Sequence, residues 1–231
     1  MTERKDAANP HANTTSTSTT RALRGLEHSS SSVRLRAALA VGTSPDPWCV
    51  GALIGRCAIE PDFSVREMLT WALTRHPASV TVPGLVGELR SEHGQARSQS
   101  LHTLSKIGDR RAWPAITRAL LTDADDEVAK SAWRAAVALV PEGREAELAG
   151  VLATQLGRGA RETRLSLSRA LIALGEAALP TLRDTMADPD PRRRRHAIAT
   201  ERLSRDPDAG FDFAIEEAKR IVALGTTGRE E

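Results

Sequence analysis

Hydrophobic and polar positions along the chain follow one pattern that recurs about every 32 residues. Each copy begins with a small or branched residue, usually followed by Arg, and continues with small or apolar residues four, seven and eleven positions later. This spacing places the apolar residues on one face of a helix. We align the copies at Val33-Arg34, Val65-Arg66, Ala96-Arg97, Val128, Thr163-Arg164 and Arg192-Arg193.

A shorter amphipathic segment precedes most copies and carries Pro near its start. Examples are residues 82–89, 113–120 and 179–186. Pro is tolerated in the first turn of a helix because its missing N–H would have no partner there. A polar turn follows, whose Asp residues can cap the next helix. Each repeat is therefore predicted to be a helix, a tight turn and a second helix, which must stack on its neighbours to bury its apolar faces.

The repeats predict an all-α fold, an α-solenoid (superhelix) of about six antiparallel helix pairs. Residues 211–224 form one more amphipathic segment and predict a C-terminal capping helix. The Ser/Thr-rich residues 1–18 have little to bury and predict a disordered tail, as do residues 226–231. We expect one repeat domain over residues 19–225.

The order of Pro, two spaced Leu, an Asp turn, Val-Arg, then Ala-Leu and Gly resembles HEAT repeats. It is most similar to the short bacterial variety first described in phycobilisome-lyase proteins, and it runs from Thr20 to Asp206. The fourth copy departs from the pattern with Ala129 in place of Arg, and the sixth with Arg192 in place of Val. The resemblance implies stacked helix pairs, whereas its function is open, since HEAT arrays serve as adaptors, regulators and occasional enzymes. Similar arrays are attached to DNA-binding heads in MerR-family regulators, and we recognise no such head here.

Composition and charge change this picture little. The chain is 40% hydrophobic and 27% charged, with 3% aromatic residues and a net charge of +2. Cys49 and Cys57 lie too far apart on a predicted helix for a disulfide, which is typical of buried thiols in a reducing compartment. The sequence shows neither a transmembrane-length apolar run nor the hydrophobic region of a signal peptide. We expect a cytoplasmic protein without membrane contact.

The recurring Arg is the first candidate for partner binding, because the second helices of HEAT arrays usually line the concave face. One interpretation is a basic groove for an acidic peptide or a phosphate. The other is that each Arg bonds a turn Asp or a carbonyl of its own or the adjacent repeat, and the resemblance favours this one. The candidate partner-binding residues are Arg34, Arg66, Arg97, Lys130, Arg134, Arg164, Arg192, Arg193, Arg194 and Arg195.

The basic run 192–195 stands at a predicted helix start, where cations oppose the helix dipole. It can grip a nucleic-acid backbone or an acidic partner, or simply face solvent. No aromatic residue lies nearby to stack on bases, so nucleic acid is the alternative partner through 192–195, and a protein is the preferred one. Trp48, Trp71, Trp113 and Trp133 are interpreted as packing residues between repeats, with binding as the alternative.

The sequence shows no catalytic or metal-binding motif. There is no nucleophile elbow, Walker loop, dinucleotide glycine fingerprint or CxxC, and the His residues lack HExxH spacing. We expect no catalytic residue, no metal, no cofactor and no small-molecule substrate, and we predict that the chain is not an enzyme.

The predicted function is a non-enzymatic protein-interaction or regulatory scaffold that binds a partner on the concave face of the solenoid. The alternative is nucleic-acid binding, or an activity similar to that of HEAT-like alkylpurine DNA glycosylases, in a basic groove. A chromophore lyase, suggested by the name of the repeat variety, is a weaker alternative because no phycobiliprotein context is visible.

Overall fold

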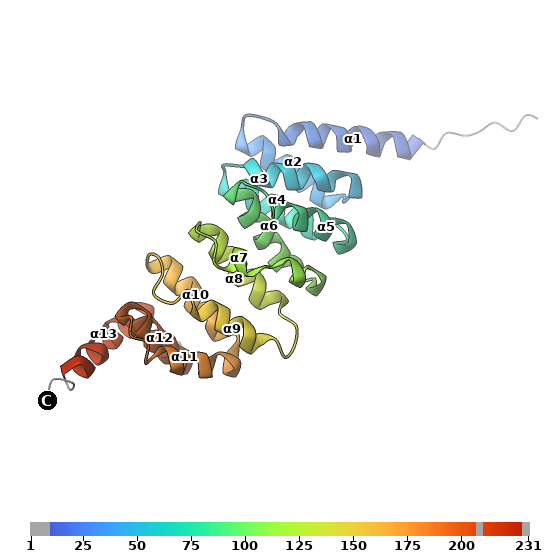
Figure 1. The fold of residues 1–231 in the computed structure, drawn as a ribbon. Coiled ribbons are helices and arrows are strands. Elements are labelled where there is room, and N and C mark those ends of the chain that lie inside the picture. The colour runs from blue at the N-terminus through green and yellow to red at the C-terminus, as the bar shows by residue number, and fades with distance from the viewer. Residues whose placement is uncertain (1–9, 207–209, 228–231) are drawn as a thin grey trace, which may run out of the picture. The chain divides into compact units, whose positions relative to one another are not determined.

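The computed structural model describes residues 10–206 and 210–227 (Figure 1). Contacts divide the chain into two compact units, unit 1 from Met1 to Ile107 and unit 2 from Gly108 to Glu231. The division falls inside the predicted repeat domain 19–225. All regular elements in the described ranges are helical, so the prediction of an all-α repeat fold is confirmed.

Unit 1 contains three helix pairs that follow one another along the chain. In each pair a first helix packs on a second, and the second helices contact each other in sequence order. The short 3-10 turn η1 (Pro47–Cys49) leads into the second pair. The pairs are α1 (Pro10–Leu26) with α2 (Ser31–Thr43), α3 (Val50–Ile59) with α4 (Phe63–Thr74), and α5 (Ala78–Glu88) with α6 (Gly94–Ile107).

Unit 2 continues the same arrangement with three pairs and a final helix. Its second helices also contact one another in order. The elements are η2 (Arg110–Ala115) and α7 (Arg118–Leu121) with α8 (Asp126–Leu139), α9 (Glu145–Ala153) with α10 (Arg161–Ala173), η3 (Gly175–Ala178) and α11 (Leu179–Thr185) with α12 (Pro191–Arg205), and α13 (Phe211–Thr227). The predicted pairs and the predicted C-terminal helix are thus present.

The apolar positions of the repeat form the interior of each unit. Leu69 and Leu104 are buried in unit 1, and Leu171 is buried in unit 2, as the spacing predicts. Small residues at the same faces, such as Ala72 and Ala170, let the helices approach closely. Helix α13 caps unit 2 through a cluster shared with α12, formed by Ile198, Ala199, Leu203, Phe211, Ala214 and Ala218.

The acidic turns cap the second helices as expected. The side chain of Asp62 accepts a hydrogen bond from the Val65 amide (3.1 Å), and that of Asp125 accepts one from the Glu127 amide (2.8 Å). At the other end of the repeat, Gly175 adopts a positive φ of 60°, a conformation that glycine tolerates without a Cβ clash. These local features mark the starts of α4 and α8 and the end of α10.

The cap of α12 corrects the alignment of the sixth copy by one residue. Asp190 accepts a hydrogen bond from the Arg192 amide (2.8 Å) and is the N-cap. Arg66 follows its cap Asp62 by four positions, and the residue four positions after Asp190 is Arg194 rather than Arg193. The sequence alignment missed this because a run of identical Arg residues has no internal landmark.

The first helices differ more from expectation. Helix α5 begins at Ala78, so Pro83 lies inside it instead of near its start. Residues 113–120 do not form one helix, because Pro114 lies in η2 and Thr117 caps the separate one-turn helix α7. Only Pro180 of α11 occupies the predicted early position. Pro marked these segments correctly but did not fix where their helices begin.

Both predicted tails are only partly described. Helix α1 begins at Pro10 and so extends into residues 1–18, whereas residues 1–9 lie outside the described ranges. Helix α13 ends at Thr227, and residues 228–231 also lie outside them. Among described helices, none alone is long and apolar enough to cross a membrane, although the sharply bent pair Arg161–Ala173 and Gly175–Thr185 passes the same test when taken together.

Candidate partner-binding groove

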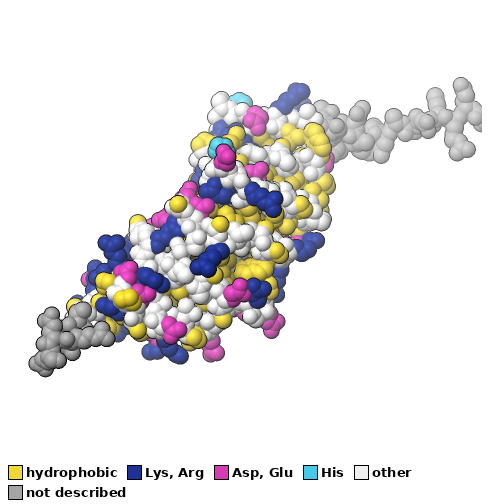
Figure 2. Space-filling view, in the orientation of Figure 1, with side chains coloured by type: hydrophobic (Ala, Val, Ile, Leu, Met, Phe, Trp, Pro, Cys, Tyr) yellow, Lys and Arg dark blue, Asp and Glu magenta, His cyan; other side chains and the backbone are white. Residues whose placement is uncertain are grey.

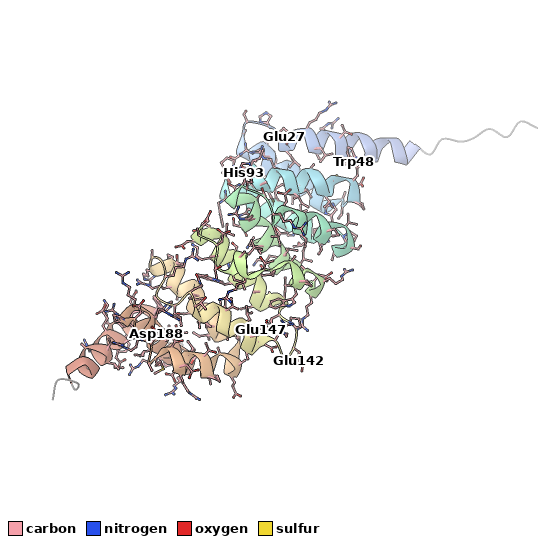
Figure 3. All side chains as sticks on the ribbon, in the orientation of Figure 1. Glu27, Trp48, His93, Glu142, Glu147 and Asp188 are labelled. Carbon is pink, nitrogen blue, oxygen red and sulfur yellow. The ribbon has the colours of Figure 1, made fainter. Side chains whose placement is uncertain are left out.

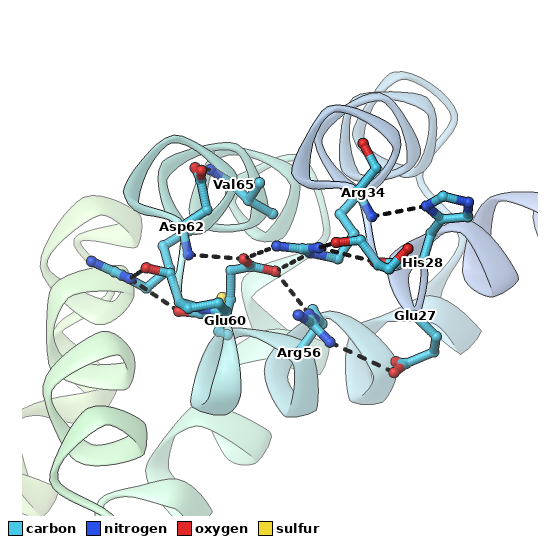
Figure 4. Close-up of polar contacts among 12 residues, drawn as sticks. Glu27, His28, Arg34, Arg56, Glu60, Asp62 and Val65 are labelled. Carbon is cyan, nitrogen blue, oxygen red and sulfur yellow. Dashed lines mark hydrogen bonds and ion pairs between the residues drawn. The ribbon is translucent and has the colours of Figure 1, made fainter.

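The first Arg of the repeat is buried. Arg34 forms a two-bond ion pair with Glu60, from Nε to Oε2 (2.7 Å) and from Nη2 to Oε1 (2.6 Å) (Figure 4). Its Nη1 donates to the carbonyls of His28 (2.9 Å) and Ser29 (2.7 Å). With 5% of its surface exposed, Arg34 stabilises the interior of unit 1 and offers little to a partner.

Glu60 is the centre of this network. Burial alone would raise the pKa of its carboxyl, but hydrogen bonds from Arg34, from the Asp62 amide and from Arg56 outweigh that effect and lower the pKa to about 2. Glu60 therefore stays ionised between two guanidinium groups. Glu27 extends the network towards the surface through its ion pair with Arg56 (3.7 Å; Figure 4).

The next two Arg residues of the series repeat the contact with backbone carbonyls. Nη1 of Arg66 donates to the carbonyls of Glu60 (3.0 Å) and Pro61 (2.8 Å). Nη1 of Arg97 donates to those of Ser91 (2.8 Å) and Glu92 (3.1 Å). In each case the acceptors lie six and five residues before the Arg, as His28 and Ser29 do for Arg34. The recurring Arg thus holds the turn that precedes its own helix.

The basic run at the start of α12 is partly used in the same way. Nη1 of Arg194 donates to the Asp188 carbonyl (2.9 Å), and Nη1 of Arg193 pairs with the Asp188 carboxylate (3.0 Å). Arg195 is half-buried and Arg192 is the exposed member of the run. Arg164, in the fifth copy, is also half-buried. Arg193 and Arg194 therefore bind the turn before α12, whereas Arg192 is exposed to solvent.

Lys130 and Arg134, by contrast, face a groove between α8 and α10 of unit 2. The groove has a volume of about 390 Å³ and gains a third basic side chain, Arg169, from α10. Its remaining lining is mostly small and apolar, with two polar residues on α10: Val137, Ala138, Glu162, Ser166, Ala170 and Ala173. A basic, apolar-floored groove on adjacent second helices is the candidate binding site.

The charges in this groove are unequally compensated. Lys130 is paired with Glu127 of its own helix (2.6 Å), and Glu162 is held by Arg161 (2.8 Å). Exposed Arg134 makes only long bonds of 3.4 Å within α8, to the Lys130 carbonyl and to Ser131. Exposed Arg169 has no hydrogen bond or ion pair with any residue that the structure describes. The guanidinium groups of Arg134 and Arg169 therefore remain available to bind a partner. Over the face of the molecule seen in Figure 2, basic and acidic side chains are interspersed.

The sequence interpretation did not include Arg169, although a signal for it exists. Arg134 follows Val128 by six positions and Arg169 follows Thr163 by six, so they are equivalent residues of consecutive repeats. Leu39, at the same position of the first copy, is 42% exposed. In these three copies the position is exposed, and comparing it between consecutive repeats would have paired Arg134 with Arg169.

The Trp residues do not share one role. Trp133 is buried, and its Nε1 donates to the Leu121 carbonyl (2.8 Å), as the packing interpretation requires. Trp71 covers Gly42, where an added Cβ would lie 2.4 Å from its ring. Trp48 is 70% exposed at the surface of unit 1 (Figure 3), so the packing interpretation is wrong for this residue.

A Ser–His contact inside unit 2 needs a separate explanation. Ser168 Oγ lies 3.0 Å from His196 Nε2, but Nδ1 of the same ring accepts a hydrogen bond from the Gly157 amide (3.0 Å). The neutral ring therefore carries its proton on Nε2 and cannot take one from Ser168. Burial lowers the pKa of His196 to about 4, although the hydrogen bond to the Arg164 carbonyl opposes this. The pair is a packing element of the interior.

Among the described residues no group of three or more His, Cys, Asp or Glu side chains is placed to hold a metal ion.

Comparisons with known proteins support the repeat assignment. Residues 53–138 match the family model of HEAT repeats, which confirms the predicted resemblance there. The solved complex of CpcE and CpcF of phycocyanin lyase from Nostoc sp. PCC7120 is 18% identical, with a TM-score of 0.47, over 100% of this chain and 93% of that chain. Human deoxyhypusine hydroxylase in complex with glycerol is 17% identical, with a TM-score of 0.47, over 92% of this chain and 97% of that chain. No curated protein matches the chain.

These comparisons correct one prediction. We predicted that the chain is not an enzyme, and both solved structures carry the names of enzymes, a lyase and a hydroxylase. A repeat fold is by itself no ground for excluding catalysis, because one fold hosts many functions. The prediction is withdrawn.

Proposed function

Because residues 53–138 are HEAT repeats, we propose that this chain is a protein-interaction scaffold that holds an acidic segment of a partner protein in the α8–α10 groove. The observation that carries the proposal is the placement of Arg134 and Arg169. Two exposed guanidinium groups from consecutive repeats border one groove, and neither pairs with an acidic side chain within residues 10–206 and 210–227.

The floor of the groove favours a protein segment over a nucleic acid. Val137, Ala138 and Ala170 offer apolar surface that a Leu or Ala side chain of a helical segment can cover. Proteins that bind single-stranded nucleic acid stack bases on aromatic residues, and the groove lining has none.

The charges of Arg134 and Arg169 act mainly on the specificity of partner binding and on the rate of association. Arg134 and Arg169 are exposed, so each contact with a partner carboxylate is screened by salt and contributes little on its own. Together they select acidic over basic segments and speed association. Binding is therefore expected to weaken as ionic strength rises.

Fluorescence anisotropy tests this with a short labelled helical peptide that carries Glu on one face and Leu on the other. The comparison probes are the same peptide with Lys in place of Glu, and single-stranded DNA of similar length. The variants are Arg134→Glu with Arg169→Glu, and the control is Arg183→Glu. Arg183 is exposed on α11 and lies outside the groove, so it carries the same charge change in the same unit.

We expect the acidic peptide to bind the native chain, the double variant to bind it at least about tenfold more weakly, and the control to be unchanged. The Lys peptide should bind poorly. The proposal is overturned if the acidic peptide does not bind, or if the double variant and the control lose affinity equally. DNA binding that depends on Arg134 and Arg169, without peptide binding, assigns the groove to nucleic acid.

A further inference from the structure

A second hollow lies on the other side of α10, among α10, α12 and α13 of unit 2. It has a volume of about 510 Å³, which falls in the range of small-molecule sites. Its lining residues are Arg161, Leu165, Ser168, Arg169, Ile172, Ala173, Leu203, Gly210 and Phe211. We propose that this hollow, called here the α10–α13 pocket, binds a small amphiphilic carboxylate.

The wall of the pocket is an extension of the hydrophobic interior. Leu203 and Phe211 belong to the buried cluster between α12 and α13, and Leu165 and Ile172 are partly buried against that cluster. The pocket thus exposes apolar surface that continues directly into the core. An alkyl or aryl group placed there removes that surface from water, which favours binding.

One charge beside this wall lacks a counterion. Arg161 is engaged by both carboxylate oxygens of Asp212 (2.8 Å each) and by Glu162 (2.8 Å). Arg169 has neither a hydrogen bond nor an ion pair within the described residues. A single unpaired guanidinium next to an apolar wall matches a ligand with one carboxylate and an apolar body.

The remaining polar group in the lining is already used. His196 Nε2–H donates to Ser168 Oγ, Ser168 donates to Thr200 Oγ1 (2.8 Å), and Thr200 donates to the His196 carbonyl (2.8 Å). The Ser168 hydroxyl therefore has no proton left to donate to a ligand. A sugar or nucleotide, which needs several donors and acceptors, finds few here, whereas a carboxylate with an alkyl chain needs only Arg169.

The position of Arg169 links the pocket to the neighbouring groove. The same side chain lines both hollows, which share Arg169 and Ala173 of α10. A carboxylate bound in the pocket neutralises a charge that the groove uses, so it lowers the affinity of the groove for an acidic segment. By thermodynamic linkage, an acidic segment in the groove lowers the affinity for the carboxylate equally.

Calorimetric titration of the full chain with octanoate, and with its neutral counterpart 1-octanol, tests the pocket. Arg169→Met removes the charge and keeps an unbranched side chain comparable to the aliphatic part of Arg, and Ile172→Trp fills the cavity. Arg134→Met is the matched control, since Arg134 lines only the groove. Thermal melting of each variant shows whether it is folded.

We expect octanoate to bind, Arg169→Met to weaken octanoate about tenfold while leaving 1-octanol unchanged, and Arg134→Met to change neither. Ile172→Trp should remove binding of both. The proposal is overturned if octanoate gives no heat of binding, or if Arg169→Met weakens the binding of octanoate and 1-octanol equally. It is also overturned if Arg134→Met weakens octanoate binding as much as Arg169→Met does. If Ile172→Trp does not fold, the charge-selective effect of Arg169→Met decides alone.

The proposals for the pocket and for the groove can be tested separately. Arg134→Glu should weaken the acidic peptide without changing octanoate, and Ile172→Trp should remove octanoate without changing the peptide. Loss of one ligand therefore leaves the other proposal standing.

Discussion

Arg158 makes the two turn contacts that Ala129 cannot make. Its Nη2 donates to the carbonyls of Asp123 (2.5 Å) and Ala124 (3.2 Å), which lie six and five residues before Ala129. In the first three copies Arg34, Arg66 and Arg97 reach the equivalent carbonyls from their own helices. Here the guanidinium belongs to Arg158 in the loop before α10. Its Nε also donates to the Asp126 carboxylate at the start of α8 (2.9 Å). The missing Arg of the fourth copy is thus replaced from the following repeat.

This replacement predicts a rescue. Arg158→Ala should lower the free energy of unfolding by about 1–3 kcal/mol, because hydrogen bonds from a charged donor to the turn carbonyls of Asp123 and Ala124 are lost. Adding Ala129→Arg should recover about half of that loss by restoring the contact in cis. Urea unfolding followed by circular dichroism measures both. If Ala129→Arg destabilises the Arg158→Ala variant further, Arg158 does not replace the missing Arg of the fourth copy.

The buried ion pair of unit 1 should be sensitive to loss of one partner. Arg34→Ala leaves the Glu60 carboxylate buried with fewer donors, and it should cost about 3–5 kcal/mol. Glu27→Ala, at an exposed end of the same network, should cost less than about 1 kcal/mol. Urea denaturation of both variants checks the difference, and equal costs would show that burial does not govern the network.

Acid should destabilise the chain in two separate pH ranges. The pKa of His196 is lowered from 6.5 to about 4, so the unfolded state takes up a proton first and stability falls as pH drops from 6.5 to 4. The pKa of Glu60 is lowered from 4.5 to about 2, so its contribution is full above pH 4.5 and is lost between 4.5 and 2. Melting temperature as a function of pH should show both. His196→Gln should flatten the upper range and leave the lower one, and an unchanged upper range would remove His196 as its cause.

Core and surface Leu residues of the same repeat pattern should differ in cost. Leu171 is fully buried on α10, so Leu171→Ala should lower the free energy of unfolding by about 2–5 kcal/mol. Leu39→Ala, at a position that is 42% exposed, should change it by less than about 1 kcal/mol. Denaturant titration compares the two, and similar costs would mean that the repeat register is wrong.

The periodicity of the second helices was enough to predict their positions and their buried faces. Leu69, Leu104 and Leu171 are buried because a helix with one apolar face packs that face against its neighbours. The first helices were predicted less well, since they are short and Pro83 is tolerated inside α5. Tertiary packing, which the local sequence does not contain, sets those boundaries.

The candidate site could be predicted only in part. Lys130 and Arg134 lie in the groove, whereas Arg34, Arg66 and Arg97 bind turns. Arg34, Arg66 and Arg97 directly follow the first residue of their repeat and reach the carbonyls five and six residues earlier, whereas Lys130 and Arg134 stand further along α8. The replacement of one Arg by Arg158 depends on a loop from another repeat, and a single copy of the pattern carries no trace of it.

The sixth position of the second helix has a consequence for how such a chain changes over time. Leu39 occupies it in unit 1 and Arg134 and Arg169 in unit 2, and all three are exposed, whereas Trp71 packs on Gly42 and Ala199 of the sixth copy is buried. Because the interior does not constrain Leu39, Arg134 and Arg169, a substitution at these three residues alters the surface at small cost to folding. Selection, or a library randomised at these sites, can retarget the scaffold one repeat at a time while its framework stays intact.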